Sequence, residues 1–288
     1  MQSDLVVRRP ATGAVVVTVD GEHVSEQRDR LATEEPMEIR VHGPGQAPMP
    51  VAVTMRTPGN DFELAVGLCR TEGIIAADDQ VDTIAYCLAP EADDPGGKPV
   101  QQYNIVTVRL RRPVAPDVGE HRYLATSACG ICGKSALDEV EVRCAPVGEG
   151  PQVAASVIRG LPDRLAAGQP VFDQTGGLHA AARFTALGDL VAVREDVGRH
   201  NALDKLVGHA LLDGALPLSD QVLLVSGRLS FELVQKAAVA GIPVLCAVSA
   251  PSSLAVSAAE RFGQTVVGFL RGARFNVYAH AERIDLAA

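Results

Sequence analysis

The amino-acid sequence predicts an α/β protein whose C-terminal half contains a mostly parallel sheet covered by helices. Three continuously apolar segments, residues 221–225, 243–248 and 265–269, have the length and composition of buried strands. Two helical segments, residues 230–240 and 252–262, separate them. Apolar strands that alternate with helices are typical of parallel strands joined by crossover helices, which cover the faces of the sheet.

The N-terminal half predicts shorter elements of mixed kind. Residues 15–19 and 51–56 read as strands, and residues 103–112 alternate apolar and polar side chains as a half-buried strand does. Residues 28–35 are polar, which predicts a connection between strands. Residues 90–99 combine proline, glycine and acids as a surface loop does. We therefore expect a smaller N-terminal α+β part beside the main sheet.

A helix is expected over residues 61–71, directly after a turn that contains proline and glycine. Asn60, followed three residues later by Glu63, has the pattern of a reciprocal cap. In such a cap each side chain binds a backbone N–H at the start of the helix. The pattern therefore predicts both the start of this helix and the role of these two side chains.

The C-terminal half begins with elements that are also regular. Residues 153–167 and 201–212 read as helices. Residues 184–187 and 190–194 flank the Gly-Asp dipeptide 188–189, which is typical of two-residue hairpin turns. We therefore expect an antiparallel hairpin ahead of the parallel strands.

Composition and charge exclude several classes of protein. The 288 residues carry a net charge of −9 and 4% aromatic residues with no tryptophan. This argues against coating a nucleic-acid backbone or stacking on its bases. No uninterrupted run of about 18 apolar residues predicts a membrane span, and the first ten residues lack the apolar core of a signal peptide. We expect a cytoplasmic protein whose six cysteines are thiols.

Three segments follow the predicted parallel strands: residues 226–228, 249–253 and 269–274. All three carry small residues, and the first and third also carry arginine. The carboxyl ends of parallel strands meet at one edge of a sheet, where such proteins bind ligands. Small residues let backbone N–H groups approach an anion, and arginine adds bidentate contacts to phosphate. The three segments together favour an anionic, phosphate-bearing ligand over ordinary turns.

The most distinctive chemical motif is Cys129-Gly-Ile-Cys132, for which we consider four functional interpretations. Half of a zinc site would need a second pair of ligands, and Cys144 is the one further cysteine nearby. A dithiol redox centre normally opens a helix near the start of a domain, whereas this pair lies in mid-chain. Residues 128–135 also differ by one residue from a phosphate-loop pattern, but no buried apolar strand precedes them.

The fourth interpretation is a mobile sulfur-carrying loop over residues 126–135. The glycine after each thiol lets the loop move and accept close approach, and Lys134 favours the thiolate at neutral pH. A thiolate can take over the outer sulfur of a persulfide by the exchange chemistry that moves disulfides. The spacing of the two cysteines does not by itself select among the four readings.

Residues 175–181 resemble the His-x-Glu helix start of zinc-dependent nucleobase deaminases, with two departures. Ala181 stands in place of the glutamate that acts as general acid and base, and the cysteine pair precedes His179 instead of following it. We therefore expect neither deaminase chemistry nor a zinc ion. A related scaffold agrees with the motif, and we interpret His179 as a site residue rather than a core residue.

Taken together, the motifs resemble those of the formate dehydrogenase accessory sulfurtransferase family (FdhD). The matching segments run in family order from about residue 50 to the C-terminus, and the long ones are far more specific than the cysteine pair. The segments are residues 56–65, 127–135, 175–179, 194–205, 226–236 and 267–274.

The resemblance implies a cytoplasmic, homodimeric sulfur carrier with a cytidine-deaminase-like three-layer core. It would take persulfide sulfur from a cysteine desulfurase and transfer it to the molybdenum cofactor, Mo-bis(molybdopterin guanine dinucleotide), before insertion into formate dehydrogenase. Cys129 would carry the persulfide, Cys132 would be an accessory thiol, and no metal ligands, nucleic acid or membrane are implied. The cofactor-binding residues would be Phe269, Leu270, Arg271, Gly272, Ala273 and Arg274.

The expected organisation has three parts: an N-terminal extension over residues 1–45, an N-terminal part over 46–145 that holds the cysteine loop, and an α/β core over 146–288. Two other functions stay open at this point. A non-catalytic molybdenum-cofactor chaperone would use the same anion-binding loops and would tolerate loss of Cys129. A nucleotide hydrolase using Lys134 would release phosphate in a magnesium-dependent reaction.

Overall fold

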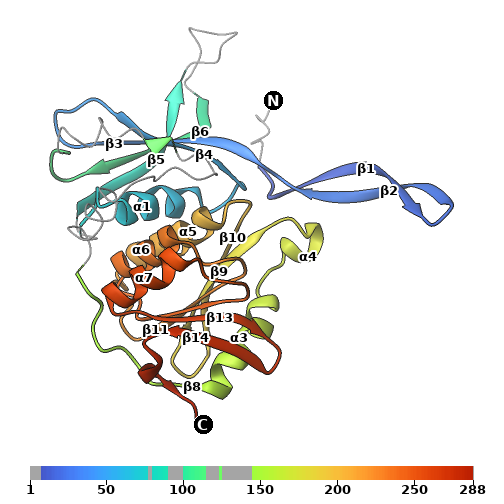
Figure 1. The fold of residues 1–288 in the computed structure, drawn as a ribbon. Helices are drawn as coiled ribbons and strands as arrows, with labels where there is room; N and C mark the ends of the chain where they lie inside the picture. Colours follow the sequence, from blue (N-terminus) through green and yellow to red (C-terminus); the bar gives the residue numbers. More distant parts are fainter. Residues whose placement is uncertain (1–7, 77–79, 90–99, 115–122, 125–144, 288) are drawn as a thin grey trace.

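The computed structural model shows a six-stranded core sheet, a smaller five-stranded sheet and a two-stranded ribbon (Figure 1). The cysteine motif and the predicted loop at 90–99 lie outside the residues that the structure describes. The described residues are 8–76, 80–89, 100–114, 123–124 and 145–287.

The ribbon consists of β1 (Ala11–Asp20) and β2 (His23–Ala32), paired antiparallel. The predicted strand at 15–19 is confirmed. The predicted connection over 28–35 is wrong, because β2 continues to Ala32. The ribbon leaves both of its faces open to solvent, so its second strand tolerates charged residues at successive positions and lacks the apolar alternation that marks a half-buried strand.

The five-stranded sheet has the order β5-β6-β3-β4-β7. The strands at 51–56 and 103–112 are confirmed within it. Because β3 pairs with β4, this sheet takes one of its strands from before residue 46. The strands are β3 (Glu35–His42), β4 (Met49–Arg56), β5 (Val81–Ala89), β6 (Val100–Leu110) and β7 (Tyr123–Leu124).

Helix α1 (Asp61–Thr71) covers this sheet and begins and ends where the sequence predicts. The predicted reciprocal cap is wrong. Asn60 has a left-handed backbone with φ 56° and makes no side-chain cap. The Glu63 carboxylate instead accepts a hydrogen bond from Nη2 of Arg194 at 2.7 Å, because a cationic partner from the core is available to it.

The six-stranded sheet has the order β10-β9-β11-β12-β13-β14. The helices and strands predicted after residue 150 are present, but the first strand of the hairpin lies at 179–185 instead of 184–187, and its connection is longer than the predicted two-residue turn. The strands are β9 (His179–Thr185), β10 (Leu190–Asp196), β11 (Gln221–Val225), β12 (Val244–Ala247), β13 (Thr265–Arg271) and β14 (Arg274–Ala279). The helices are α3 (Ala155–Ala166), α4 (Phe172–Thr175), α5 (Arg199–Leu212), α6 (Phe231–Val239) and α7 (Ser253–Phe262). A short pair, β8 (Val153–Ala154) and β15 (Ile284–Asp285), lies beside them.

The sheet is mixed, so the prediction of a mostly parallel sheet is wrong in part. β11, β12 and β13 are parallel, as expected. β9 pairs antiparallel with both β10 and β11, and β14 pairs antiparallel with β13. Two of these three antiparallel pairs, β9 with β10 and β13 with β14, follow from their connections: Gly188 (φ 87°) and Gly272 (φ 55°) sit in tight turns, and such turns can join only antiparallel strands.

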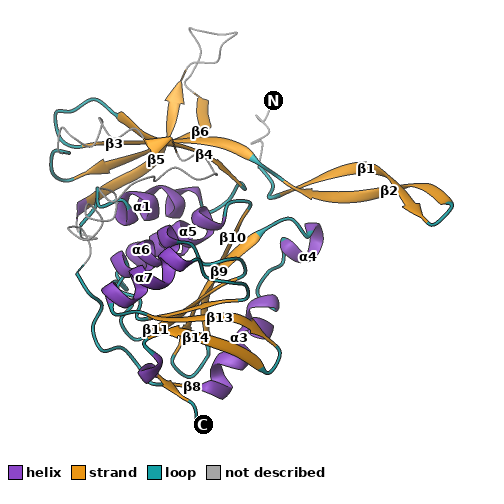
Figure 2. Ribbon diagram, viewed as in Figure 1, coloured by secondary structure: helices purple, strands orange, loops and turns teal. Residues whose placement is uncertain are grey.

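Helices cover both faces of this sheet, which gives three layers (Figure 2). Side chains alternate along each strand. Leu223 of β11 therefore packs with α5, α6 and α7, while Leu224 packs with α3 on the opposite face. This alternation explains why the parallel strands are apolar throughout.

The two sheets are joined by close contact between α1 and α5. A Cβ atom at Gly67 would lie 1.8 Å from the Asp204 carbonyl oxygen, and one at Gly208 would lie 1.8 Å from the Glu63 carbonyl oxygen. Only glycine allows the two backbones to approach this closely. The two glycines therefore fix how the N-terminal part sits on the core.

Buried ion pairs surround this joint. Asp196 binds Nζ of Lys205 at 2.7 Å and also accepts the backbone N–H of Thr57 at 3.1 Å. Arg56, fully buried, binds Asp61 at 2.9 Å. Lys236 binds Asp204 at 3.0 Å. Many residues of three family segments therefore serve to connect the two sheets. These segments are residues 56–65, 194–205 and 226–236.

Candidate functional site

The loops after the three parallel strands form one continuous edge. The Leu229 N–H donates to the Ala250 carbonyl at 3.1 Å, and the Ser252 N–H donates to the Leu229 carbonyl at 3.0 Å. The Phe269 N–H donates to the Ser249 carbonyl at 3.1 Å. The structure thus brings together the three segments that the sequence singled out. We call residues 226–230, 249–253 and 269–274 the strand-end edge.

The third segment forms the hairpin between β13 and β14. Phe269 has a positive φ of 52° and is 42% exposed, whereas Leu270 is buried among the core residues beneath α3. A ligand can therefore reach the backbone but not the Leu270 side chain. Gly272 and Ala273 make the turn and present little side chain. The segment offers a ligand mainly its backbone and the arginines that flank the turn.

Arg271 and Arg274 lie directly opposite each other in this hairpin, and both are exposed. Like charges in opposite positions of neighbouring strands repel. Arg271 donates a hydrogen bond from Nε to the Val248 carbonyl at 3.3 Å. Within the described part of the chain, neither guanidinium has a carboxylate partner. An anion bound between them would relieve the repulsion.

Two helices also begin at this edge. Ser252 caps α7 by accepting the Ala255 N–H at 3.2 Å. Ser230 precedes α6 without capping it, since its hydroxyl lies 3.3 Å from Nε2 of His200. The positive ends of these helix dipoles add to the positive potential at the edge.

His179 lies at the same edge, at the start of β9. The Nδ1 atom of its ring is 3.4 Å from the position that a Cβ of Gly227 would take, so the absence of a side chain there makes room for the ring. Burial lowers the pKa of His179, and the charges of Arg199 and His200 lower it further. The residue as a whole is exposed, so His179 is not a core residue; its role as a site residue stays a prediction.

Three side chains at this edge were missed in the sequence. His200 Nε2 lies 2.7 Å from Oε2 of Glu232, and this hydrogen bond is the largest cause of the lowered pKa of Glu232. Nε of Arg199 is buried without a hydrogen-bond partner among the described residues. All three lie in segments matched to the family, 194–205 and 226–236, but nothing in their spacing separates them from the structural residues beside them.

Cys129 and Cys132 lie outside the described residues, as does Cys144. Cys69 and Cys246 are fully buried, and burial raises the pKa of each thiol far above its usual range. Both therefore behave as small core residues, whereas Cys87 is half-buried. No group of three or more potential metal ligands occurs within the part of the chain that the structure describes. Over those same residues, no helix has the length and hydropathy needed to span a membrane.

The chain belongs to the FdhD/NarQ family, which it matches over residues 32–285. It is 52% identical over 282 residues to the sulfur carrier protein FdhD of Streptomyces avermitilis, covering 95% of each chain. It is 50% identical to that of Mycobacterium tuberculosis, covering 92% of this chain and 95% of the relative. It is 43% identical to that of Sulfurisphaera tokodaii, covering 93% of this chain and 97% of the relative.

A crystal structure of a protein from Desulfotalea psychrophila, described as a candidate formate dehydrogenase accessory protein, has the same fold. The TM-score is 0.73 at 24% sequence identity, and the match covers 96% of this chain and 99% of that one. The resemblance to this family seen in the sequence motifs is thereby confirmed.

Proposed function

We propose that the protein is a sulfur carrier that supplies sulfur to the molybdenum cofactor before its insertion into formate dehydrogenase. The observation that carries this proposal is about 50% identity, over nearly the whole chain, to proteins named sulfur carrier protein FdhD. The donor is a cysteine desulfurase and the client is a formate dehydrogenase. The protein acts in the cytoplasm as a homodimer.

Loading is a thiolate exchange at Cys129. The Cys129 thiolate attacks the outer sulfur of the persulfide on the desulfurase, and a new S–S bond forms. The bond to the donor cysteine breaks, and that cysteine leaves as a thiolate. No net oxidation occurs, because one persulfide replaces another. Lys134, five residues further on, favours the attacking thiolate.

Delivery of the sulfur as sulfide requires two electrons, and the cysteine pair can supply them. The Cys132 thiolate attacks the inner sulfur of the Cys129 persulfide, which closes a disulfide between the two residues and releases hydrosulfide. Hydrosulfide plus one proton can replace an oxo ligand of the molybdenum, and the oxygen leaves as water. A cellular dithiol then reduces the Cys129–Cys132 disulfide for the next round.

The cargo, Mo-bis(molybdopterin guanine dinucleotide), is held at residues 269–274. Arg271 and Arg274 bind its phosphates, and the backbone of the hairpin lines the site. The two opposed guanidinium groups, which have no carboxylate partner among the described residues, support this assignment, as do the helix N-termini at the same edge. No zinc ion is needed for folding, so a chelator should leave the melting temperature unchanged.

We also propose that the core has a cytidine-deaminase-like fold. The three layers, and the hairpin of β9 and β10 ahead of the parallel strands, support it. So does the position of His179 at the ligand edge. Superposition of the core on a nucleobase deaminase tests this: His179 should fall near the zinc-binding histidine of the deaminase, and a different strand order would contradict the proposed fold.

The mass of the intact protein after incubation with a desulfurase and cysteine tests the proposed function. We expect one additional sulfur atom, removed by reductant, and peptide mapping should place it on Cys129. Cys129→Ala should abolish the adduct. Cys132→Ala should keep the adduct but fail to release sulfide. A variant without Cys129 that still supports formate dehydrogenase would instead indicate a non-catalytic chaperone.

A further inference from the structure

The ribbon formed by β1 and β2 extends away from both sheets (Figure 1). Its base is tied to the core, where Arg30 hydrogen-bonds to Gln174 of α4. A two-stranded ribbon is at best marginally stable in water by itself. The extended part of this ribbon therefore needs a surface to cover it.

One face of the ribbon carries an apolar row. Val15, Val17 and Val19 alternate along β1 and so share a face, and Val24 lies opposite Val19 in β2. Their exposed fractions are 70%, 63%, 66% and 62%, respectively. Scattered exposed valines would need no explanation, but four on one face of a projecting element mark a contact surface.

Opposite charges lie beside this row. In the register of the ribbon, Arg28 is directly opposite Val15, and Glu26 is directly opposite Val17. The face therefore has valines along β1, and along β2 it has the acidic Glu26 followed by the basic Arg28. Such a pattern is complementary to itself, because reversing the strand direction places each charge on its opposite.

We propose that this face binds the same face of a second copy of the chain around a twofold axis. If Val15 lies on the partner's Val17, the same axis places Glu26 on the partner's Arg28, and Arg28 on the partner's Glu26. One symmetry operation thus buries the valines and pairs both charges, as a self-complementary twofold interface requires.

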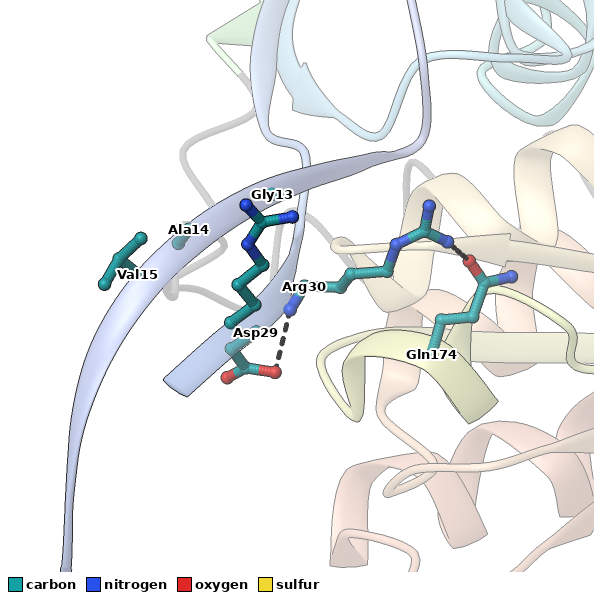
Figure 3. A pocket seen from close by; sticks show the side chains of 7 residues that line it. Gly13, Ala14, Val15, Asp29, Arg30 and Gln174 are labelled. Carbon is teal, nitrogen blue, oxygen red and sulfur yellow. Dashed lines mark hydrogen bonds between the residues drawn. The ribbon is translucent and has the colours of Figure 1, made fainter. Parts of the chain in front are cut away.

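The base of the ribbon offers room for the tip of the partner's ribbon. A hollow of about 660 Å³ lies there, and Gly13 contributes no side chain to it (Figure 3). The twofold axis that aligns the charges also brings the partner's Val19 onto Gly13 and the partner's Val24 beside Arg30. The lining residues are Gly13, Ala14, Val15, Arg28, Asp29, Arg30 and Gln174.

This inference rests on the homodimer proposed above and adds the surface that forms it. The contact residues, all between 13 and 30, precede Ala32, where the match to the family begins, so the surface is not part of what defines the family. The exchange proposed above needs only the Cys129 thiolate and the donor persulfide, so loading should proceed in every ribbon variant.

Sedimentation equilibrium of the full chain tests the surface with matched variants. Val17→Asp should raise the dimer dissociation constant about a hundredfold or more, because it places a charge in the desolvated centre of the interface. Val16→Asp makes the same change on the opposite face and should leave the constant within about threefold of the parent. A parent dimer that is indifferent to Val17→Asp overturns the ribbon surface alone. A monomeric parent overturns the homodimer as well.

A charge exchange tests the register. Glu26→Arg and Arg28→Glu should each weaken self-association about tenfold or more, since each places like charges together. A mixture of the two variants should form a heterodimer, because every pair across the axis is then attractive. Loss of self-association in both variants without recovery in the mixture would overturn the proposed twofold register.

Discussion

The joint between the two sheets and the strand-end edge both take residues from the segments 194–205 and 226–236, yet charged side chains are paired at the joint and exposed at the edge. At the joint, Lys205 and Lys236 are buried and each binds an aspartate. At the edge, Arg271 and Arg274 are exposed and face each other without a carboxylate partner in the described residues. A paired charge holds the fold together, whereas an unpaired charge is available to a ligand.

The comparison shows that a motif rich in charged residues does not by itself mark a binding site. Within residues 194–205, Asp196 and Lys205 form a buried pair, while the charge of Arg199 lowers the pKa of His179 at the edge. The two kinds of residue alternate along one segment. Substitutions at the joint should therefore lower the free energy of unfolding, and the protein that still folds should bind ligand normally. Substitutions at the edge should weaken ligand binding and leave the free energy of unfolding unchanged.

The largest loss of stability is expected for Gly208→Ala. A Cβ atom there would lie 1.8 Å from the Glu63 carbonyl oxygen, so α1 and α5 must separate. We expect a loss of stability of about 3 kcal/mol or more, measured by chemical denaturation. Gly160→Ala in α3 is the matched control, because nothing lies within 4 Å of its added Cβ. The control should stabilise the protein by up to about 1 kcal/mol. Equal stability of the two variants would contradict the close contact.

Lys205→Met should have the next largest effect. It leaves Asp196 buried and without its cation, a loss that costs about 3–5 kcal/mol when a buried pair is broken. Adding Asp196→Asn should recover part of this loss, because the unpaired charge is removed. The double variant is compared with both single variants by chemical denaturation. A single variant within about 0.5 kcal/mol of the parent would show that the pair is not needed.

Arg274→Ala should weaken ligand binding without lowering stability, the opposite of what is expected for Lys205→Met. The exposed guanidinium has little to do with stability, so unfolding should match the parent within about 0.5 kcal/mol. Binding of GDP, measured by calorimetry, should weaken roughly ten- to hundredfold with loss of a charge-assisted hydrogen bond. Arg159→Ala, on the outer surface of α3, is the control and should bind as the parent does. Loss of sulfur loading at Cys129 in Arg274→Ala would show that the two sites are not separable.

Most of the core could be predicted from the sequence because its signals are local. The strands β11, β12 and β13 are apolar throughout, and helices with clear periodicity separate them. The mixed character of the sheet was missed because direction depends on the turns. Gly272 and Ala273 were read as part of a ligand segment, although they also close the hairpin to β14.

The position of the strand-end edge could also be predicted, because it too follows from local sequence signals. Segments that follow parallel strands must meet at one edge, so the three loops could be placed together from the sequence. The partners of individual side chains could not. Glu63 looked like a helix cap, but it binds Arg194, which lies 131 residues away. Whether a charge has a partner depends on such long-range contacts, and no local pattern carries that information.

The smallest effect is a shift in the titration of His179. Burial and the neighbouring charges lower its pKa, so the unfolded chain takes up its proton first as the pH falls. Stability from this group is therefore fully present above the unfolded pKa of about 6.5 and declines as the pH falls below it. Arg199→Gln removes one of the charges and should raise the pKa of His179, although burial still keeps it below the ordinary value. Nuclear magnetic resonance of the imidazole ring measures both titrations directly. An unchanged pKa in Arg199→Gln would mean that the Arg199 charge does not act on His179, and that this end of the edge is not electrostatically connected to α5.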